Sequence, residues 1–349
     1  MDDIGMDVHK LASQLCVIGD GGEVYERRVR TDRGCLTGEL GERPRSRILI
    51  EASTESEWVA RHLESIGHEV IVGDPSFAPM YGTRSRRVKT DRRDARALAE
   101  ALRLGAYRPV HRVSEEQRRV RAELAVRDGL VRARTRWISL VRSLLRSEGY
   151  RVPSGSSSGF VGRVAEMELP GRTRSTIAPV LAVMLPLNRQ VDWCDRVVTR
   201  IVAKDPVVRR LTTVPGVGPI TSAGFVATID DVKRFRGADK VAAYVGVVPS
   251  EVSSGEKHIR GPITKSGHKR IRSLLVEAAW CVLRQRSSRS AALREWAERI
   301  AARRGKNKAA VALARKLARI LFALWRDGTS YEVRADSNKI TEPAHRVTI

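Results

Sequence analysis

The sequence predicts a protein of the α/β plus α class, with a mixed sheet flanked by helices at the N-terminal end and mostly helical structure after it. Short apolar stretches with the two-residue alternation of strands gather in the first quarter of the chain. Apolar residues at helical spacing run through most of the remainder. The length of 349 residues suggests two or three domains, and a hydrophobic content of 42% is sufficient for ordered cores.

The N-terminal elements are three strands in succession, then strands alternating with helices. Asp20-Gly21-Gly22 is a hairpin turn between the second and third strands. We expect strands over 4–8, 13–18, 23–29, 47–51 and 69–73, and helices over 55–66 and 92–104. This order matches a ribonuclease-H-like sheet, in which acidic residues stand at neighbouring strand ends.

Two long helices are expected next, with arginines on their outer faces. Leu130, Trp137 and Leu144 repeat every seven residues, which predicts a parallel or antiparallel coiled coil. The helices are expected over 114–147 and 174–204, joined through a flexible loop over 150–159, with a break allowed near Pro186. Leu124, Ala133, Leu140 and Val141 are expected to fill the seam.

The C-terminal part contains a short glycine-bearing turn and a long basic stretch. Residues 211–229 include Val-Pro-Gly-Val-Gly-Pro-Ile-Thr, which indicates a helix-hairpin-helix that binds a DNA backbone through Gly216 and Gly218; an ordinary tight turn is the alternative. The basic, glycine-punctuated stretch 246–270 is expected to be a functional or disordered loop. Helices are expected over 267–286, 291–303 and 306–326, before a weakly ordered tail over 328–349.

The charge is placed unevenly along the chain. The net charge is −1 over residues 1–105, +11 over 106–210 and +14 over 211–349, which totals the +24 of the whole sequence. Such a basic excess indicates a polyanionic partner, most simply nucleic acid. A membrane-surface protein is disfavoured because no amphipathic anchor rich in Trp or Phe is present.

The same sequence indicates a cytoplasmic protein. No apolar run approaches the roughly 20 residues that span a bilayer, and no signal-peptide pattern is found. The cysteines are scattered, so we expect neither zinc nor disulfides. They are Cys16, Cys35, Cys194 and Cys281.

Four acids are candidate ligands of a divalent cation. Asp7 and Glu51 each end an apolar strand, where burial is costly without a cationic partner. Asp91 and Asp94 stand three residues apart at a helix start and therefore share one face. One or two Mg²⁺ or Mn²⁺ ions held there would support phosphoryl transfer. Each acid alone has an ordinary alternative, such as a helix cap at Asp91 or a first-turn acid at Asp94.

A serine followed by several cations forms a second candidate site. Ser253-Ser254-Gly255 reads from spacing alone as a simple turn, since no Ser–His–Asp triad is apparent. The cations after it are suited to neutralise a phosphate. They are Lys257, Arg260, Lys265, Lys269 and Arg270.

The combination of these motifs over nearly the whole chain resembles the DEDD insertion-sequence transposases, a family that includes Piv-type invertases and bridge-RNA-guided recombinases. The motifs that carry the resemblance are Gly5-Met6-Asp7, Ile50-Glu51-Ala52-Ser53, Lys89-Thr90-Asp91-Arg92-Arg93-Asp94-Ala95, Pro215-Gly216-Val217-Gly218, Gly246-Val247-Val248-Pro249, Ser253-Ser254-Gly255 and Lys265-Ser266-Gly267-His268. The departures are small: Met6 and Val8 flank the first acid, and two valines fill the Gly246–Pro249 motif.

The resemblance implies a RuvC-like domain over 1–106, a coiled-coil arm over 107–206, a C-terminal transposase domain over 207–327 and a tail over 328–349. It implies that Asp7, Glu51, Asp91 and Asp94 bind metal. It also implies that Ser254, or failing that Ser253, forms a covalent phosphoserine link to the cut strand. The implied partners are donor and target DNA, a structured bridge RNA and further copies of the chain in a dimer or tetramer. The implied location is the bacterial nucleoid.

Three hypotheses remain open at this point. The first is a serine- and metal-dependent transposase or invertase. The second is a metal-dependent nuclease or junction resolvase that uses water as the nucleophile. The third is a binding protein without activity, which the four intact acids disfavour.

Overall fold

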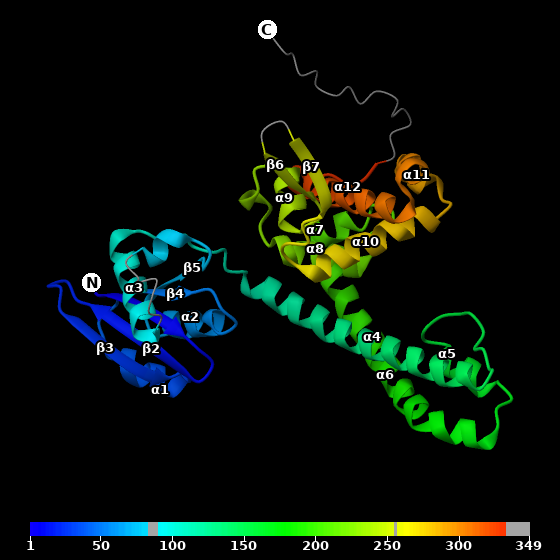
Figure 1. Ribbon diagram of the computed structural model, residues 1–349, viewed down its shortest axis with the longest axis horizontal. Coiled ribbons are helices and arrows are strands. Elements are labelled where there is room, and N and C mark those ends of the chain that lie inside the picture. The colour runs from blue at the N-terminus through cyan, green and yellow to red at the C-terminus, as the bar shows by residue number, and fades with distance from the viewer. Residues whose placement is uncertain (83–89, 255–256, 333–349) are drawn as a thin grey trace, which may run out of the picture. The chain divides into compact units, whose positions relative to one another are not determined.

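The computed structural model describes residues 1–82, 90–254 and 257–332, which form two compact units, Met1–Arg112 and Val113–Ile349 (Figure 1). Each unit has its own core. The first is a mixed α/β unit around a five-stranded sheet, and the second is largely helical. The α/β plus α class predicted from the sequence is therefore confirmed.

The sheet of the first unit has the strand order β3-β2-β1-β4-β5. β1 pairs antiparallel with β2, β2 pairs antiparallel with β3, and β1, β4 and β5 run parallel. The strands are β1 (Asp3–Val8), β2 (Ala12–Ile18), β3 (Val24–Arg30), β4 (Arg47–Glu51) and β5 (Glu69–Gly73). All five strands were expected. The predicted turn also forms, since Gly22 N donates to Gly19 O across 3.0 Å.

Helices α1 (Arg33–Leu40), α2 (Ser56–Ser65) and α3 (Asp91–Leu104) complete this unit, with a short 3₁₀ turn η1 (Ala78–Tyr81). α1 was not expected from the sequence. Its two glycines lower helix propensity, and Asp32 starts it by accepting a hydrogen bond from Cys35 N at 2.8 Å. Apolar side chains of β1, β4 and α2 share one core.

α3 lies unusually close to β1 because β1 carries a glycine there. A Cβ atom added to Gly5 would stand 2.0 Å from Ala95 O and 2.2 Å from Ala99 N. The small residues of α3, Ala95 and Ala99, are fully buried at the same place. The backbones of β1 and α3 are therefore in direct contact, and the start of α3 is held beside the end of β1.

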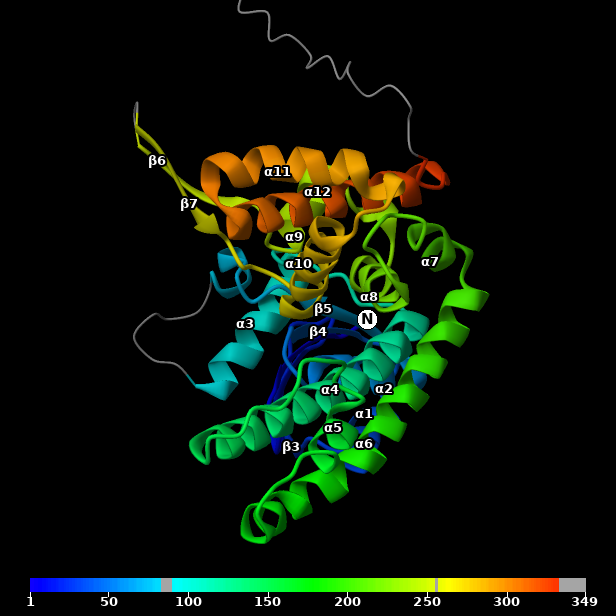
Figure 2. The same cartoon turned by 90° about the vertical axis from the view of Figure 1, so that its right-hand side faces the viewer.

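The second unit begins with a helix pair, α4 (Glu115–Ser147) and α6 (Gly171–Lys204), with α5 (Phe160–Ala165) beside its far end (Figures 1 and 2). The pair is antiparallel, since Arg127 contacts Asp195 whereas Arg134 contacts Asn188. Of the two coiled-coil orientations left open by the sequence, the structure has the antiparallel one.

The seam of this helix pair agrees with the predicted one in part. Val141 is buried as expected, and Trp137 and Leu144 pack against the same core, whereas Leu140 is 45% exposed. Ile138 and Leu145 are buried there as well, because a straight helix turns by about 20° per heptad relative to a seven-residue repeat, which shifts the contact stripe toward them. The break that the sequence allowed near Pro186 does not occur, because α6 continues through Pro179 and Pro186.

The remaining helices pack around a common core together with the first turns of α4. They are α7 (Pro206–Leu211), α8 (Pro219–Ile229), α9 (Ala238–Tyr244), α10 (Lys269–Arg284), α11 (Ala291–Arg304) and α12 (Lys306–Asp327), with short 3₁₀ turns η2 (Val232–Arg234) and η3 (Ser288–Ser290). The predicted C-terminal helices are confirmed, whereas the short helices α5 and α9 were not expected. Within the described ranges, no helix has the length and apolar character that crossing a bilayer requires.

The stretch 246–270 contains a β-hairpin where a loop was expected. β6 (Pro249–Ser254) pairs antiparallel with β7 (Lys257–Ile263), in a register that sets Val252 opposite Ile259 and Ser254 opposite Lys257. Val252 and Ile259 are β-branched and favour strands, and this preference outweighs the glycines and serines around them. Gly255 and residue 256, between the strands, lie outside the described residues, as do residues 333–349 of the expected tail.

We predict that Gly5→Ala weakens the first unit by about 2–3 kcal/mol, because the new methyl group meets backbone atoms that cannot move aside. Chemical denaturation of the full chain measures the change. The matched control is Gly38→Ala in α1, where no atom lies within 4 Å of the added Cβ. That change is expected to stabilise by about 0.5–1 kcal/mol. Equal stability of Gly5→Ala and the native chain would contradict the close packing of α3 on β1.

Candidate active site

Asp7 and Glu51 stand at the same end of two neighbouring parallel strands. β1 and β4 pair in a register that sets Met6 beside Ile50, so the next residue of each strand is an acid. Asp7 is only 8% exposed, and Glu51 is partly buried. The hydroxyl of Tyr81 donates a hydrogen bond to Glu51 Oε2, which orients that carboxylate.

α3 brings the other two acids. Thr90 is the N-cap, with its hydroxyl accepting from Arg93 N at 3.4 Å, so Asp91 is the first helical residue and not the cap. Asp94 follows almost one turn later and is 6% exposed, although acids in a first turn are usually solvated. Lys89, the first residue of the motif, lies outside the described residues.

The other three acids act on the carboxyl group of Asp7. Burial raises the pKa of Asp7 above its ordinary value. His9 opposes the rise, and the negative charges of Asp94, Asp91 and Glu51 add to it. A buried carboxylate held near three others is stabilised by a cation and by little else.

His9 is a further member of this cluster that the sequence reasoning missed. Its Nε2 atom lies 3.2 Å from Asp7 Oδ2 and 3.6 Å from Asp91 Oδ1. The ligand atoms of Asp7, His9 and Asp91 all lie within 4.8 Å of one another. The available signal was the spacing, because residues two apart at a strand end lie on the same side.

These residues fit a divalent cation. The donors are hard carboxylate oxygens, two of the four acids are nearly buried, and the pKa of Asp7 is raised by its burial and, to a smaller extent, by the neighbouring carboxylates. Asp7, Glu51, Asp91 and Asp94 would hold the ion, with the His9 imidazole as an additional donor.

A pocket of about 550 Å³ opens beside Asp91. Gln14, Glu26, Arg28 and Arg92 contribute to its lining, and Arg92 is held by Glu26 at 3.0 Å. The pocket therefore offers guanidinium groups next to the acids, an arrangement suited to a phosphate that approaches a metal site.

In the second unit, two glycine motifs cross at the base of the β6–β7 hairpin. Gly246 and Gly267 both have positive φ angles, 73° and 70°. A Cβ on Gly246 would lie 2.1 Å from Ser266 O, and one on Gly267 would lie 2.0 Å from Tyr244 O. The crossing fixes where the hairpin leaves the helical core, and with it the backbone of Ser253 and Ser254 in β6.

The predicted cations near this hairpin are placed in three different ways. Lys257 and Arg260 lie in β7, and their side chains are outside the described part of the chain. Lys265 and Lys269 are exposed at the hairpin base and at the start of α10. Arg270 is half-buried, and burial lowers the pKa of its guanidinium, with Asp128 and Arg127 of α4 among the charges that act on it.

The predicted glycines of the α7–α8 turn have different surroundings. Gly216 is half-buried against α10, where an added Cβ would lie 2.5 Å from Ala278 O. Gly218 is exposed and directly precedes α8. Gly218 is thus the better placed of the two to meet a ligand.

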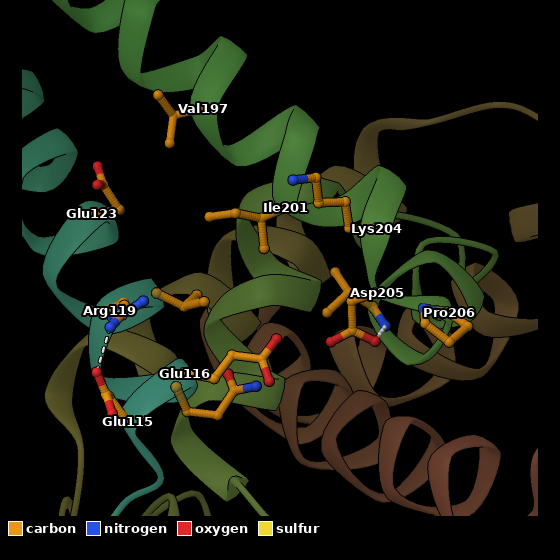
Figure 3. A pocket seen from close by; sticks show the side chains of 12 residues that line it. Glu115, Glu116, Arg119, Glu123, Val197, Ile201, Lys204, Asp205 and Pro206 are labelled. Carbon is orange, nitrogen blue, oxygen red and sulfur yellow. Dashed lines mark hydrogen bonds and ion pairs between the residues drawn. The ribbon is translucent and has the colours of Figure 1, made fainter.

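A larger pocket, of about 990 Å³, lies between the start of α4, the end of α6 and α7 (Figure 3). Its walls carry the carboxylates of Glu115, Glu116, Glu123 and Asp205, against Arg119 and Lys204. Glu115 is already paired with Arg119. The excess of carboxylates makes this pocket unsuited to a nucleic-acid phosphate.

Comparison with known proteins gives two family matches that together span most of the chain. Residues 208–294 match the family described as "Transposase IS116/IS110/IS902 family", and residues 4–148 match the DEDD model described as "Transposase". A probable family 20 transposase of Pseudomonas aeruginosa is 32% identical over 334 residues, with 94% of this chain and 98% of that protein covered. The chain belongs to the IS116/IS110/IS902 transposase family.

Two further relatives are also named as transposases. The transposase for insertion sequence element IS1111A of Coxiella burnetii is 28% identical, covering 92% of this chain and 88% of that protein. A putative transposase of Sinorhizobium fredii is 30% identical, covering 94% of this chain and 85% of that protein. This chain is thus an insertion-sequence transposase, an enzyme class that acts on DNA, and DEDD transposases generally depend on a divalent metal ion.

We predict that Asp7→Asn raises the free energy of unfolding of the metal-free transposase at neutral pH. The folded pKa of Asp7 lies above its unfolded value, so ionised Asp7 destabilises the fold at any pH above the folded pKa. The increase in the free energy of unfolding is about 1.4 kcal/mol for each unit by which folding raises the pKa of Asp7. This increase becomes smaller as the pH falls from the pKa of Asp7 in the folded chain toward its pKa in the unfolded chain. Calorimetry across pH 4–8 in chelator, roughly spanning these ionisations, measures it.

The control for this prediction is Glu42→Gln, which removes one carboxylate from an exposed position of the same unit. It is expected to leave stability unchanged within about 0.5 kcal/mol. An Asp7→Asn variant that is less stable than the native chain throughout this pH range would show that ionised Asp7 does not destabilise the fold.

Proposed function

We propose that this transposase cuts and rejoins DNA through a serine nucleophile, Ser254, assisted by Mg²⁺ or Mn²⁺ at Asp7, Glu51, Asp91 and Asp94. The observation that carries the proposal is the burial of Asp7 and Asp94 within one cluster of four acids. Buried carboxylates of this kind are retained where they bind a cation.

The chemistry is divided between the two candidate sites. A divalent cation supplies charge stabilisation to the entering and leaving oxygens of a phosphoryl transfer. Ser254 Oγ forms a bond to phosphorus, the bond from phosphorus to the neighbouring sugar oxygen breaks, and that oxygen carries the proton away as a hydroxyl. Attack by the hydroxyl of another strand reverses the step and frees the serine. Ser253 is the alternative nucleophile.

The cations around each site bind and orient the phosphate. Lys257, Arg260, Lys265, Lys269 and Arg270 are assigned to the strand that Ser254 attacks. Arg28 and Arg92 line the pocket beside Asp91 and are assigned to the strand near the acids. Guanidinium and ammonium groups both neutralise phosphate, and guanidinium also fixes its orientation.

The architecture is consistent with this assignment. The strand order β3-β2-β1-β4-β5, with β2 antiparallel, supports a RuvC-like, ribonuclease-H-like first domain. We assign residues 1–106 to that domain, 107–206 to the arm, 207–327 to the transposase domain and 328–349 to a tail. The turn between α7 and α8 is assigned as a helix-hairpin-helix that binds the DNA backbone through Gly216 and Gly218.

The proposed partners are donor DNA, target DNA and a structured bridge RNA, bound by a homo-oligomer, a dimer or tetramer, at the nucleoid. The +24 charge of the chain supports binding of several nucleic-acid segments at once. Little in the sequence indicates direct base readout, which suits targeting by base pairing. A site-specific invertase of the same family would use the same chemistry, and a water-dependent nuclease or resolvase is the alternative.

We predict that Ser254→Ala reduces the covalent protein–DNA adduct by at least about 1,000-fold, because the adduct requires that oxygen. Denaturing gels of labelled DNA measure the adduct, and gel-shift titration shows unchanged DNA binding. Ser253→Ala is the matched control and retains the adduct. An adduct that survives both substitutions would assign the nucleophile elsewhere, and free 5′-phosphate ends without any adduct would favour the nuclease.

We predict that Mg²⁺ or Mn²⁺ raises the melting temperature of the native chain and not that of Asp7→Asn. An ion that binds only the folded state stabilises by about 2.7 kcal/mol at 100 times its Kd. Thermal denaturation without nucleic acid measures the shift independently of activity. Glu42→Gln serves again as the control and keeps the shift. A full metal-dependent shift in Asp7→Asn would remove Asp7 from the metal ligands.

A further inference from the structure

A basic pocket of about 540 Å³ lies at the far end of the α4–α6 pair. It is lined by Arg142 and Arg146 of α4, and by residues of the segment that follows the helix. The segment turns back directly after α4, because Tyr150 N donates to Leu145 O at 2.8 Å. The segment's lining residues are Tyr150, Arg151, Val152 and Ser154. Three guanidinium groups thus share one concave surface without a carboxylate in its lining. We call it the arm-tip pocket.

The arginines of α4 differ along its length. Arg119, Arg127 and Arg132 each pair with an acid: Glu115, Asp195 and Asp128, respectively. Among the described residues, by contrast, no ion pair is found for Arg142, Arg146 or Arg151. Arg142 and Arg146 are four residues apart on one helix face, where like charges repel. An anion in the arm-tip pocket removes this repulsion.

The walls of the arm-tip pocket are held before any ligand arrives. Arg163 of α5 donates from Nε to Pro153 O at 3.1 Å and from a terminal nitrogen to Ser156 O at 2.7 Å. The Arg142 guanidinium lies over the ring of Phe160, 5.6 Å from its centre, and Phe160 is fully buried. A preformed site loses little entropy when it binds.

We infer that the arm-tip pocket binds the phosphate of an unpaired nucleotide in a nucleic acid strand. Its volume is in the range of roughly 300–1,000 Å³ that is usual for ligand sites. Three arginines suit the phosphate, and Tyr150, which lines the pocket and is half-buried, is an aromatic residue of the kind on which bases stack. A base splayed from a loop enters a concave pocket, whereas the bases of a duplex stay stacked inside it. The inference rests on the proposed function only in taking nucleic acid as the ligand.

The test compares two double variants of the full-length chain that each remove two arginines from α4. Arg142→Ala with Arg146→Ala empties the pocket of two cations. Arg119→Ala with Arg132→Ala is the matched control, because these arginines are already paired. Affinity is measured in chelator, without cleavage, for single-stranded RNA, single-stranded DNA of the same sequence and a DNA duplex, over a range of salt concentrations.

The pocket variant is expected to bind single strands about 10- to 100-fold more weakly near physiological salt. Its salt slope is expected to be smaller by about 0.7, because one single-strand phosphate is no longer neutralised. The control variant and duplex binding are expected to change by less than about 3-fold. A decrease confined to RNA or to DNA identifies the natural source of the nucleotide. Equal decreases in both double variants, or an equal decrease for the duplex, would overturn the inference.

Arg146→Ala with Arg151→Ala is a second pocket variant that leaves the contact between Arg142 and Phe160 in place. It guards against misfolding around α5 and is expected to reproduce the weaker binding of single strands. Because binding is measured without chemistry, a chain that lacks strand transfer would contradict the proposed function and still leave this test decisive.

Discussion

The contact on which the candidate site depends is the one between the backbones of β1 and α3 at Gly5. The strand supplies Asp7 and the helix supplies Asp91 and Asp94, and neither element alone gathers enough charge to bind a divalent cation. With a side chain at position 5 the helix would have to move outward, since the space is already filled by Ala95 O and Ala99 N. Asp94 is buried because the helix lies so close. The geometry of the acids is therefore a consequence of packing, and the repulsion between them is offset by the apolar core beneath.

Close packing of two backbone segments at glycine residues also positions the C-terminal candidate site. Gly246 and Gly267 let two loop segments cross with backbone atoms nearly in contact, and the β6–β7 hairpin extends from this crossing. Arg272 strengthens the crossing by donating to Val245 O at 3.1 Å and to Ser266 O at 2.9 Å. The family motifs around Gly246 and Gly267 thus carry a structural role that is separate from the chemistry proposed for Ser254. A substitution in these motifs that abolishes activity can therefore act by displacing the hairpin as well as by removing a catalytic group.

The sequence predicted the features that depend on local pattern and missed those that depend on tertiary contact. The five strands and the long helices follow from alternation, propensity and turn residues. Asp7 and Glu51 were found because an acid that ends an apolar strand is unusual. His9 was missed because a histidine beside lysine looks like solvated surface until α3 brings Asp91 near it. The hairpin at 249–263 was missed because its glycines and serines indicate a loop. Leu140 was wrongly placed in the seam of the helix pair because the exact contact stripe depends on the partner helix.

Helix α4 links two regions of opposite charge within the second unit. Its first turns contribute Glu115, Glu116 and Glu123 to an acidic pocket, and its last turns contribute Arg142 and Arg146 to the arm-tip pocket. The acids suit the positive end of the helix dipole and the arginines suit the negative end, so the helix tolerates both clusters. The first cluster disfavours a phosphate, and the second is the site that we propose for one. A uniformly positive surface would bind phosphate everywhere with equal strength. Acidic regions between basic ones restrict binding to defined places, which a chain that holds several strands requires.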